Sequence, residues 1–113
     1  MVKHSTQMDA VFQALAHEAR RDVLRRLAGH ELTVGELAAP LAMSLPAASR
    51  HIHVLEHAGL VQRTVQGRRH LCRLNPGPLA SAVDWLRFYE RFWTERLDGL
   101  DAVLALHPLP SPE

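Results

Sequence analysis

The chain has 113 residues, enough for one domain with a buried core, and its 47% hydrophobic and 22% charged residues are ordinary for a globular protein rather than a disordered one. The net charge is only +1, and the single cysteine, Cys72, excludes an intrachain disulfide and a cysteine-based zinc cluster. Because no apolar run resembles a signal peptide or approaches the roughly 18 residues of a membrane span, we expect a cytoplasmic location and no membrane association.

Apolar residues recur at helical spacing in the first part of the chain and predict two helices. The first covers residues 7–16 and the second covers residues 18–28. Gly29 is expected to end the second helix, because glycine adopts the left-handed conformation of a C′ residue easily.

Two capping signals follow this helix pair. Thr33 and Glu36 have the spacing of a capping box, in which each side chain accepts a backbone N–H of the other residue, so a short helix is expected as far as Leu41. Ser44 is the next candidate N-cap, and a longer helix is expected from there to Ala58. A short helix, a brief turn and a longer helix in series predict a helix-turn-helix.

The second helix of this helix-turn-helix, which covers about residues 33–58, has two different faces. The buried face is expected to consist of Leu45, Ala48, Ile52 and Leu55. The opposite side carries the small residues Ala47 and Ser49 beside Arg50. Small residues let a helix enter a DNA groove closely, and an arginine can then bind the edge of a guanine. The other outward residues are Pro46, His53 and His57.

Residues 60–66 and 69–74 predict two strands on either side of a glycine-containing turn, which is the pattern of a β-hairpin. Arg68 and Arg69 lie at or beside the tip of this hairpin. A helix-turn-helix followed directly by a basic hairpin is a winged helix, and the wing covers about residues 60–75.

Positive charge is concentrated in residues 44–75, which carry five arginines against one acidic residue, Glu56. A local basic stripe of this kind favours double-stranded DNA as the partner, although a solvated charged surface could have the same composition. The wing arginines are expected to contact phosphates. Arg20 could pair with a nearby acidic residue or contact a phosphate.

A helix-breaking segment at residues 75–78 precedes one long expected helix over about residues 79–106. Its apolar and aromatic residues are more than a small domain can cover. The surplus predicts contact with the same helix of a second copy, and therefore a homodimer. An apolar ligand pocket between the last helix and the first is the alternative. The residues expected at the dimer interface are Met8, Phe12, Trp85, Phe88, Tyr89, Phe92, Trp93, Leu97, Leu100 and Leu104.

Together these elements predict one domain over residues 1–113, a mainly α-helical winged helix-turn-helix with five helices, a small two-stranded wing and a long C-terminal dimerisation helix. No spacing of nucleophile, base or phosphate-binding glycines indicates an enzyme. A winged helix that binds another protein is the alternative to a DNA-binding regulator. Such a module has no need for a basic recognition helix and wing.

Four stretches carry a resemblance to the ArsR (arsenic-repressor-type) family of dimeric winged-helix transcriptional regulators. They are residues 14–24, residues 36–39, residues 49–61 with Ser-Arg-His and Ala-Gly-Leu-Val, and residues 67–74 with Gly-Arg-Arg. The resemblance implies a homodimer that binds a palindromic operator and represses transcription. His51 matches a histidine of the family's recognition helix, where it could orient the helix against DNA or be a half-buried structural residue. The expected DNA-binding residues are Ser44, Pro46, Ala47, Ser49, Arg50, His51, His53, Arg68 and Arg69.

The family's metal sites are not matched. Thr33 and Gly35 stand where the resemblance would place the two thiols of its thiolate site. The last helix lacks the second family site, because the second residue after Asp84 is Leu86 where a histidine is needed. The chain is therefore similar to a non-metal subgroup with an aromatic last helix. We expect no metal and no cofactor, and the effector, if any, is an unknown small molecule.

Two groups of residues leave alternatives open. His53 and His57 lie four residues apart with Glu56 beside them, so they could face the DNA groove or solvent, make a buried contact, or bind a metal in a repressor with non-standard ligands. Cys72 shares a strand face with Leu74 and is expected in the core, with a redox switch as the alternative.

Overall fold

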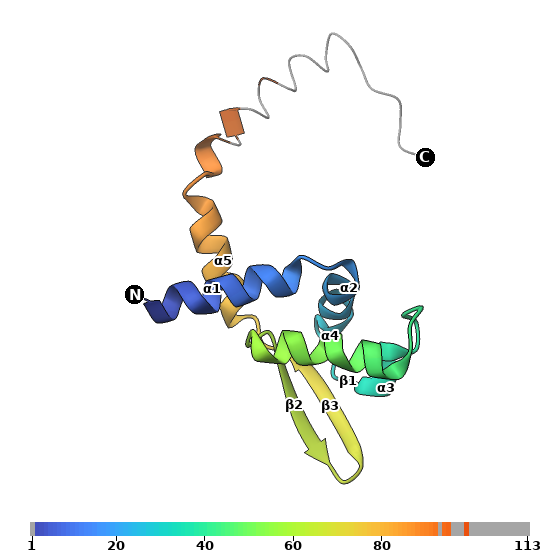
Figure 1. The fold of residues 1–113 in the computed structure, drawn as a ribbon. Helices are drawn as coiled ribbons and strands as arrows, with labels where there is room; N and C mark the ends of the chain where they lie inside the picture. Colours follow the sequence, from blue (N-terminus) through green and yellow to red (C-terminus); the bar gives the residue numbers. More distant parts are fainter. Residues whose placement is uncertain (1, 93, 96–98, 100–113) are drawn as a thin grey trace, which may run out of the picture. The chain divides into compact units, whose positions relative to one another are not determined.

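The computed structural model describes residues 2–92, 94, 95 and 99 of the chain. Its elements form two compact units, residues 1–82 and residues 83–113, and each is described by itself. The elements, in chain order, are α1 (Val2–Leu15), α2 (Glu18–Leu27), β1 (Leu32–Thr33), α3 (Val34–Ala38), α4 (Leu45–His57), β2 (Val61–Gln66), β3 (Arg69–Leu74) and α5 (Gly77–Arg87) (Figure 1). None of the helices described is long and apolar enough to cross a membrane.

The two expected N-terminal helices are confirmed, although α1 begins at Val2 rather than at residue 7. His17 is the N-cap of α2, because its Nδ1 accepts the backbone N–H of Ala19 at 3.2 Å. Gly29 follows the C-cap of α2 with a φ of 79°, which is the left-handed conformation expected there.

The capping box at the start of α3 is confirmed. Thr33 Oγ1 accepts the N–H of Glu36 at 3.1 Å, and Glu36 Oε1 accepts the N–H of Thr33 at 2.8 Å. The backbone N–H of Thr33, which donates to the carboxylate, is the main cause that lowers the pKa of Glu36, and the Thr33 side chain lowers this pKa further. The helix ends at Ala38, earlier than the expected Leu41. Arg26 of α2 donates to the carbonyls of Glu36 and Leu37 at 2.6 and 2.8 Å, so it satisfies carbonyls of this short helix from outside.

The sheet has three strands, where the sequence predicted a two-stranded wing. Its order is β1-β3-β2, and all pairs are antiparallel. The hairpin β2–β3 is confirmed, but β1 adds to the open edge of β3, with Leu32 opposite Cys72. A two-residue strand has too little alternation to be recognised from sequence, and only the pairing with β3 defines it.

The core lies where α1, α2 and α4 pack together over the sheet. Cys72, at the centre of β3, is fully buried and belongs to this core, as expected. Burial raises the pKa of its thiol, so less of the reactive thiolate form is present at a given pH. The buried core residues are Val11, Ala14, Val23, Leu24, Leu27, Leu37, Ile52, Leu55, Ala58, Leu60, Val61, Cys72 and Ala82.

One expected core residue is on the surface. Ala48, Ile52 and Leu55 of α4 are buried, but Leu45 is 58% exposed. It occupies the first turn of α4, beyond the part of the helix that the core covers. The row of apolar residues on α4 therefore extends one helical turn beyond the part of the helix that is buried in the structure.

One long helix was expected over residues 79–106, but in the described part of this range the helix is shorter. α5 begins at Gly77 and ends at Arg87, after which Phe88 and Tyr89 form a turn. The N–H groups of these two residues bond to the carbonyls three positions earlier, which tightens the helix end. The expected interface residues Trp93, Leu97, Leu100 and Leu104 lie outside the described residues.

Candidate nucleic-acid interface

The start of α4 is built by an N-cap. Ser44 Oγ accepts the backbone N–H of Ala47 at 3.3 Å, and Pro46 occupies the first turn, where no N–H is needed. Ser44 and Pro46 are exposed and Ala47 is half-buried, so small side chains form the surface at this helix end. The cap thus presents a narrow helix end that could approach another molecule closely.

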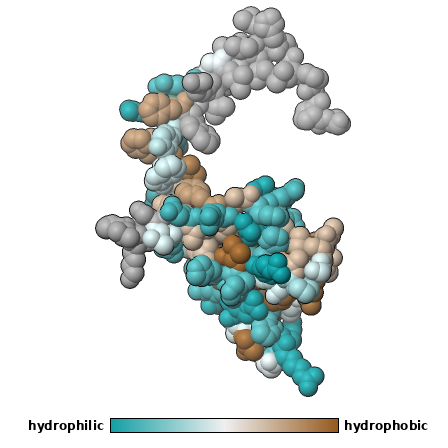
Figure 2. All heavy atoms as spheres, in the orientation of Figure 1, coloured by the Kyte–Doolittle hydropathy of each residue, from teal (hydrophilic) through white to brown (hydrophobic). Residues whose placement is uncertain are grey.

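Farther along the same helix, Arg50 and His53 are exposed, and Ser49 is half-buried. The expected groove-facing residues therefore lie together on α4, outside the core. Arg68 and Arg69 are exposed at the far end of the hairpin β2–β3, which extends away from the helices (Figure 1). The surface of this hairpin tip is hydrophilic in Figure 2. Helix and wing are thus two separate parts of one candidate interface.

Arg20 links the N-terminal helices to α4. Its guanidinium donates to the carbonyls of Ala14 and Gln13 at 2.8 and 2.9 Å, and it lies 3.2 Å from Nδ1 of His51. The partners of Arg20 in the described chain are thus carbonyl oxygens and an imidazole, and not the acidic residue that was one of the two expectations. His51 is half-buried, and its ring lies 4.3 Å from the ring of His17, centre to centre. Its place in the fold therefore agrees with a structural role in positioning α4.

The protonation state of His51 follows from these neighbours. Burial disfavours its charged form and lowers the pKa of the ring, and His17, Arg20 and Arg50 lower the pKa further. Because the Arg20 guanidinium can only donate, Nδ1 of His51 acts as the acceptor. The neutral ring then carries its proton on Nε2.

The carboxylate of Glu56 is bound by an arginine. This carboxylate accepts two bonds from Arg63, from Nη2 at 2.7 Å and from Nε at 3.1 Å. His53 Nδ1 is 3.7 Å from the same carboxylate, and His57 is exposed. Within the part of the chain that the structure describes, no group of three His, Cys, Asp or Glu side chains could hold a metal ion.

The ion pair between Glu56 and Arg63 is a feature that sequence analysis missed. Arg63 is one of the five arginines that make residues 44–75 basic, and the sequence shows its charge but not its partner. The same hairpin holds Arg73, whose Nε donates to Gln62 Oε1 at 3.1 Å. Arg50, Arg68 and Arg69 thus remain as the exposed arginines of residues 44–75 for which no hydrogen bond or ion pair is found in the described chain.

A hollow lies between the start of α3 and the hairpin. Its lining includes Thr33 and Gly35 from the first side and Arg68, Arg69 and His70 from the second. Thr33 and Gly35 stand where the resemblance would place the two thiols, and neither residue has a sulfur atom. The hollow is open and basic, and its chemistry suits an anion better than a soft metal.

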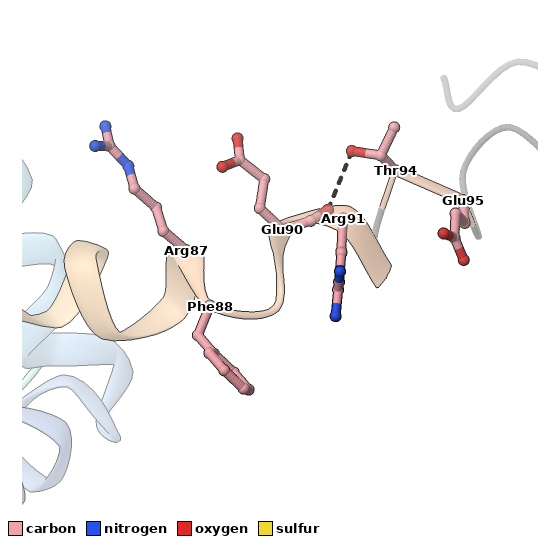
Figure 3. Close-up of a pocket in the computed structure, with 6 residues that line it drawn as sticks. All are labelled: Arg87, Phe88, Glu90, Arg91, Thr94 and Glu95. Carbon is pink, nitrogen blue, oxygen red and sulfur yellow. Dashed lines mark hydrogen bonds between the residues drawn. The ribbon is translucent and has the colours of Figure 1, made fainter.

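Aromatic side chains dominate the segment that starts at residue 83. Phe88 is 72% exposed and Trp85 is 50% exposed, and both contact Tyr89 edge to face. Figure 2 shows hydrophobic atoms on the surface of this segment. In Figure 3, Phe88 and Arg91 project to one side of the chain, whereas Arg87 and Glu90 project to the other. Thr94 Oγ1 donates to the carbonyl of Glu90 at 3.0 Å.

The contact between α1 and the start of α5 leaves little space. Where Gln7, Met8 and Val11 of α1 meet Pro78 and Ser81 of α5, the cavity measures only about 20 Å³. That is space for about one water molecule. Between these described residues, no drug-sized ligand fits.

Comparisons with known proteins agree on one kind of protein. A family model described as a helix-turn-helix domain matches residues 15–64. "HTH-type transcriptional regulator Rv2034" of Mycobacterium tuberculosis is 44% identical over 91 residues, which are 80% of this chain and 82% of that protein. "Transcriptional repressor SdpR" of Bacillus subtilis is 29% identical over 70% of this chain and 88% of its own length. The crystal structure of "ArsR family transcriptional regulator, RHA00566" matches with a TM-score of 0.73 and 39% identity over 80% of this chain and 93% of that one.

Proposed function

The chain belongs to the ArsR family of winged helix-turn-helix, DNA-binding transcriptional regulators, and we propose that it is a homodimeric repressor of a palindromic operator. One observation carries the proposal most directly. A capped helix with a small-residue start and an exposed Arg50 is followed by a hairpin with two exposed arginines at its end. This is the arrangement that a major-groove helix with a phosphate-binding wing requires.

Each side chain of the interface has a proposed task. Pro46 and Ala47 allow the helix to approach DNA closely. Ser44 caps the helix start and places the backbone N–H groups there beside a phosphate. Ser49, Arg50 and His53 contact base edges or adjacent phosphates. Arg68 and Arg69 contact phosphates beside the groove. His51 supports the helix from its half-buried side, where its Nδ1 is engaged by Arg20.

The aromatic segment supports a homodimer. Large exposed apolar side chains beyond residue 83 indicate a surface that a partner covers. A second copy is the simplest partner, and two related recognition helices then require half-sites about one helical turn apart. Met8 and Phe12 of α1 are partly buried and complete the proposed interface.

Regulation by the known metal sites of the family is not part of the proposal. Thr33 and Gly35 cannot supply thiolates, and the aromatic last helix lacks the histidines of the second site. We infer a regulator that works without a resident cofactor.

Fluorescence anisotropy with the duplex upstream of the protein's own gene tests the proposal. A scrambled duplex of the same composition is the comparison, and both are measured over a salt series. We expect a preference of about 10³ or more for the native duplex and a steep loss of affinity with salt, because bound arginines release counterions. A promoter–reporter fusion then shows whether the protein lowers transcription.

Two variants separate base recognition from phosphate contact. Arg50→Ala should reduce the preference between duplexes, whereas Arg68→Ala should weaken both and lower the salt slope by about one. Arg25→Ala, which removes an arginine on the exposed side of α2, is the matched control and should change neither. Equal affinities for all duplexes at every salt concentration, or no binding at low salt, would argue against the proposal and favour a protein partner.

A further inference from the structure

Glu56 is the one acidic residue in residues 44–75, and it lies in the last turn of the proposed recognition helix. Its carboxylate and the guanidinium of Arg63 in β2 form a two-pronged pair, with bonds of 2.7 and 3.1 Å. The side chains of Glu56 and Arg63 are only 24% and 23% exposed. A bidentate pair between planar groups fixes the orientation as well as the distance of the elements that carry them.

Sheet register explains why this pair joins the helix to the wing. Arg63 is opposite Cys72, and Val61 is opposite Leu74, so these four side chains share one face of the sheet. Cys72 and Val61 are buried, which identifies this face as the one that packs on the helices. Arg63 therefore lies at the edge of the core, between α4 and the wing.

The same guanidinium also reaches the second strand of the wing. Arg63 Nη1 lies 3.3 Å from Nδ1 of His70 in β3. A single arginine thus connects α4 with β2 and β3. Its bonds to Glu56 join β2 to α4, and its contact with His70 is made next to Arg69 at the start of β3.

The charge of Glu56 works against DNA binding when it is considered alone. A carboxylate beside a phosphate-binding surface repels phosphates, and it neutralises one of the five arginines. A simple charge account therefore expects that removal of the carboxylate strengthens binding to every duplex. If the pair instead orients the wing, removal of the carboxylate should weaken binding to the preferred duplex.

We propose that Glu56 is a positioning residue that, through Arg63, holds the wing at a fixed angle to the recognition helix. Base contacts by α4 and phosphate contacts by Arg68 and Arg69 can then form at the same time. This inference rests on the proposed DNA-binding function and adds to it the part that couples the two halves of the interface.

The test compares Glu56→Gln with Glu31→Gln, a matched variant that removes an exposed carboxylate outside residues 44–75. Wild type first selects its preferred duplexes from a random pool. Anisotropy then measures the affinity of each variant for a selected and a scrambled duplex, with and without Arg68→Ala. Hydrogen exchange of the free proteins follows residues 61–74 without any DNA.

We expect Glu56→Gln to lower the preference for the selected duplex by roughly tenfold while affinity for scrambled DNA stays the same or rises. Arg68→Ala should cost wild type more than it costs Glu56→Gln, because a displaced wing has less contact to lose. Hairpin amides should exchange faster in Glu56→Gln, and Glu31→Gln should match wild type throughout. Arg63→Lys, which keeps the charge but not the two-pronged geometry, should be intermediate.

Other results overturn the inference. If Glu56→Gln strengthens binding to both duplexes equally and keeps the full cost of Arg68→Ala, the pair has only an electrostatic effect. If hairpin exchange is unchanged, the pair does not hold the wing, whatever happens with DNA. Should Glu56→Gln fold poorly, the double exchange Glu56→Arg with Arg63→Glu restores the pair and must restore selectivity. Failure of wild type to select any sequence would instead refute the proposed function, and hairpin exchange would still test the pair.

Discussion

Leu45 and Ile52 lie on the same apolar stripe of α4, yet one is 58% exposed and the other is fully buried. The periodicity of a helix shows which residues share a face, but not how far along that face a neighbouring element extends. Only Ile52 contacts the core, so the two residues should differ in their contribution to stability.

Ile52→Ala should lower the free energy of unfolding by about 2–5 kcal/mol, because it removes buried methyl groups and leaves a cavity. Leu45→Ala should change it by less than about 0.5 kcal/mol, as expected for an exposed position. Urea denaturation of both variants measures the difference. Similar losses in the two variants would mean that Leu45 is covered in solution, for instance by a second copy.

His51 makes stability depend on pH, because its pKa is lower in the folded protein than in the unfolded chain. Burial is the main cause, followed by the charges of His17, Arg20 and Arg50. The unfolded ring therefore binds a proton at a higher pH than the folded ring does. Its contribution to stability is complete above the unfolded value of about 6.5 and is lost as the pH falls through the folded-state pKa.

The melting temperature of wild type should consequently fall more steeply from about pH 7.5 to 5.5 than that of His51→Asn, which cannot titrate there. His30→Asn, which removes an exposed histidine, is the control and should keep the slope of wild type. Differential scanning calorimetry over this range is the measurement. Parallel curves for wild type and His51→Asn would show that the proton on His51 does not matter for the fold.

At the scale of single elements, the two helices of the helix-turn-helix begin in the same way but have different proposed tasks. Thr33 caps α3 and Ser44 caps α4, each through a side-chain oxygen and a backbone N–H three residues on. An N-cap satisfies a donor that the helix cannot satisfy itself. The loss of either cap should thus cost stability, but only one should affect DNA binding.

Ser44→Ala and Thr33→Ala should each lower the unfolding free energy by about 1 kcal/mol. Ser44→Ala should also weaken binding to the preferred duplex, because the first turn of α4 frays where it would approach the DNA. Thr33→Ala is the matched control and should keep its affinity. Chemical denaturation and anisotropy on the same samples separate the two effects, and equal affinities for both variants would argue against a role of the α4 start in binding.

For the whole molecule, the exposed aromatic residues after α5 raise the question of what covers them. Phe88 is 72% exposed, and Trp85 and Phe92 are about half exposed in the single chain. Burying such rings against a second copy releases the water that hydrates their surface, and this lowers the free energy of the dimer relative to the single chain. This is the physical basis of the proposed homodimer.

Phe88→Glu should raise the dimer dissociation constant by at least about 30-fold, the equivalent of 2 kcal/mol, because it would bury an unpaired charge in the interface. Val65→Glu is the control, since Val65 is 59% exposed on the wing and outside the proposed interface. Sedimentation equilibrium measures both. A wild type that is monomeric at every concentration, or a Phe88→Glu variant that remains a dimer, would contradict the proposed interface.

The helices up to α4, the N-caps Thr33 and Ser44, the hairpin and the burial of Cys72 could be predicted from the sequence, whereas the N-cap His17 and the end of α5 at Arg87 could not. The predicted features depend on contacts between residues close in the chain, or on the alternation of apolar residues, and both are visible in the order of residues. The outward residues of α4 and the wing arginines are likewise defined by spacing and charge.

Contacts between residues far apart in the chain were decided by the tertiary structure. The pairing of β1 with β3, the binding of Arg20 to His51 and the ion pair of Glu56 with Arg63 all join segments that the sequence separates. Local preference cannot select such partners, because their energy arises only when packing brings the groups together and excludes water. For the same reason, the sequence shows that Arg63 is charged, whereas the fold decides that this charge faces a carboxylate instead of DNA.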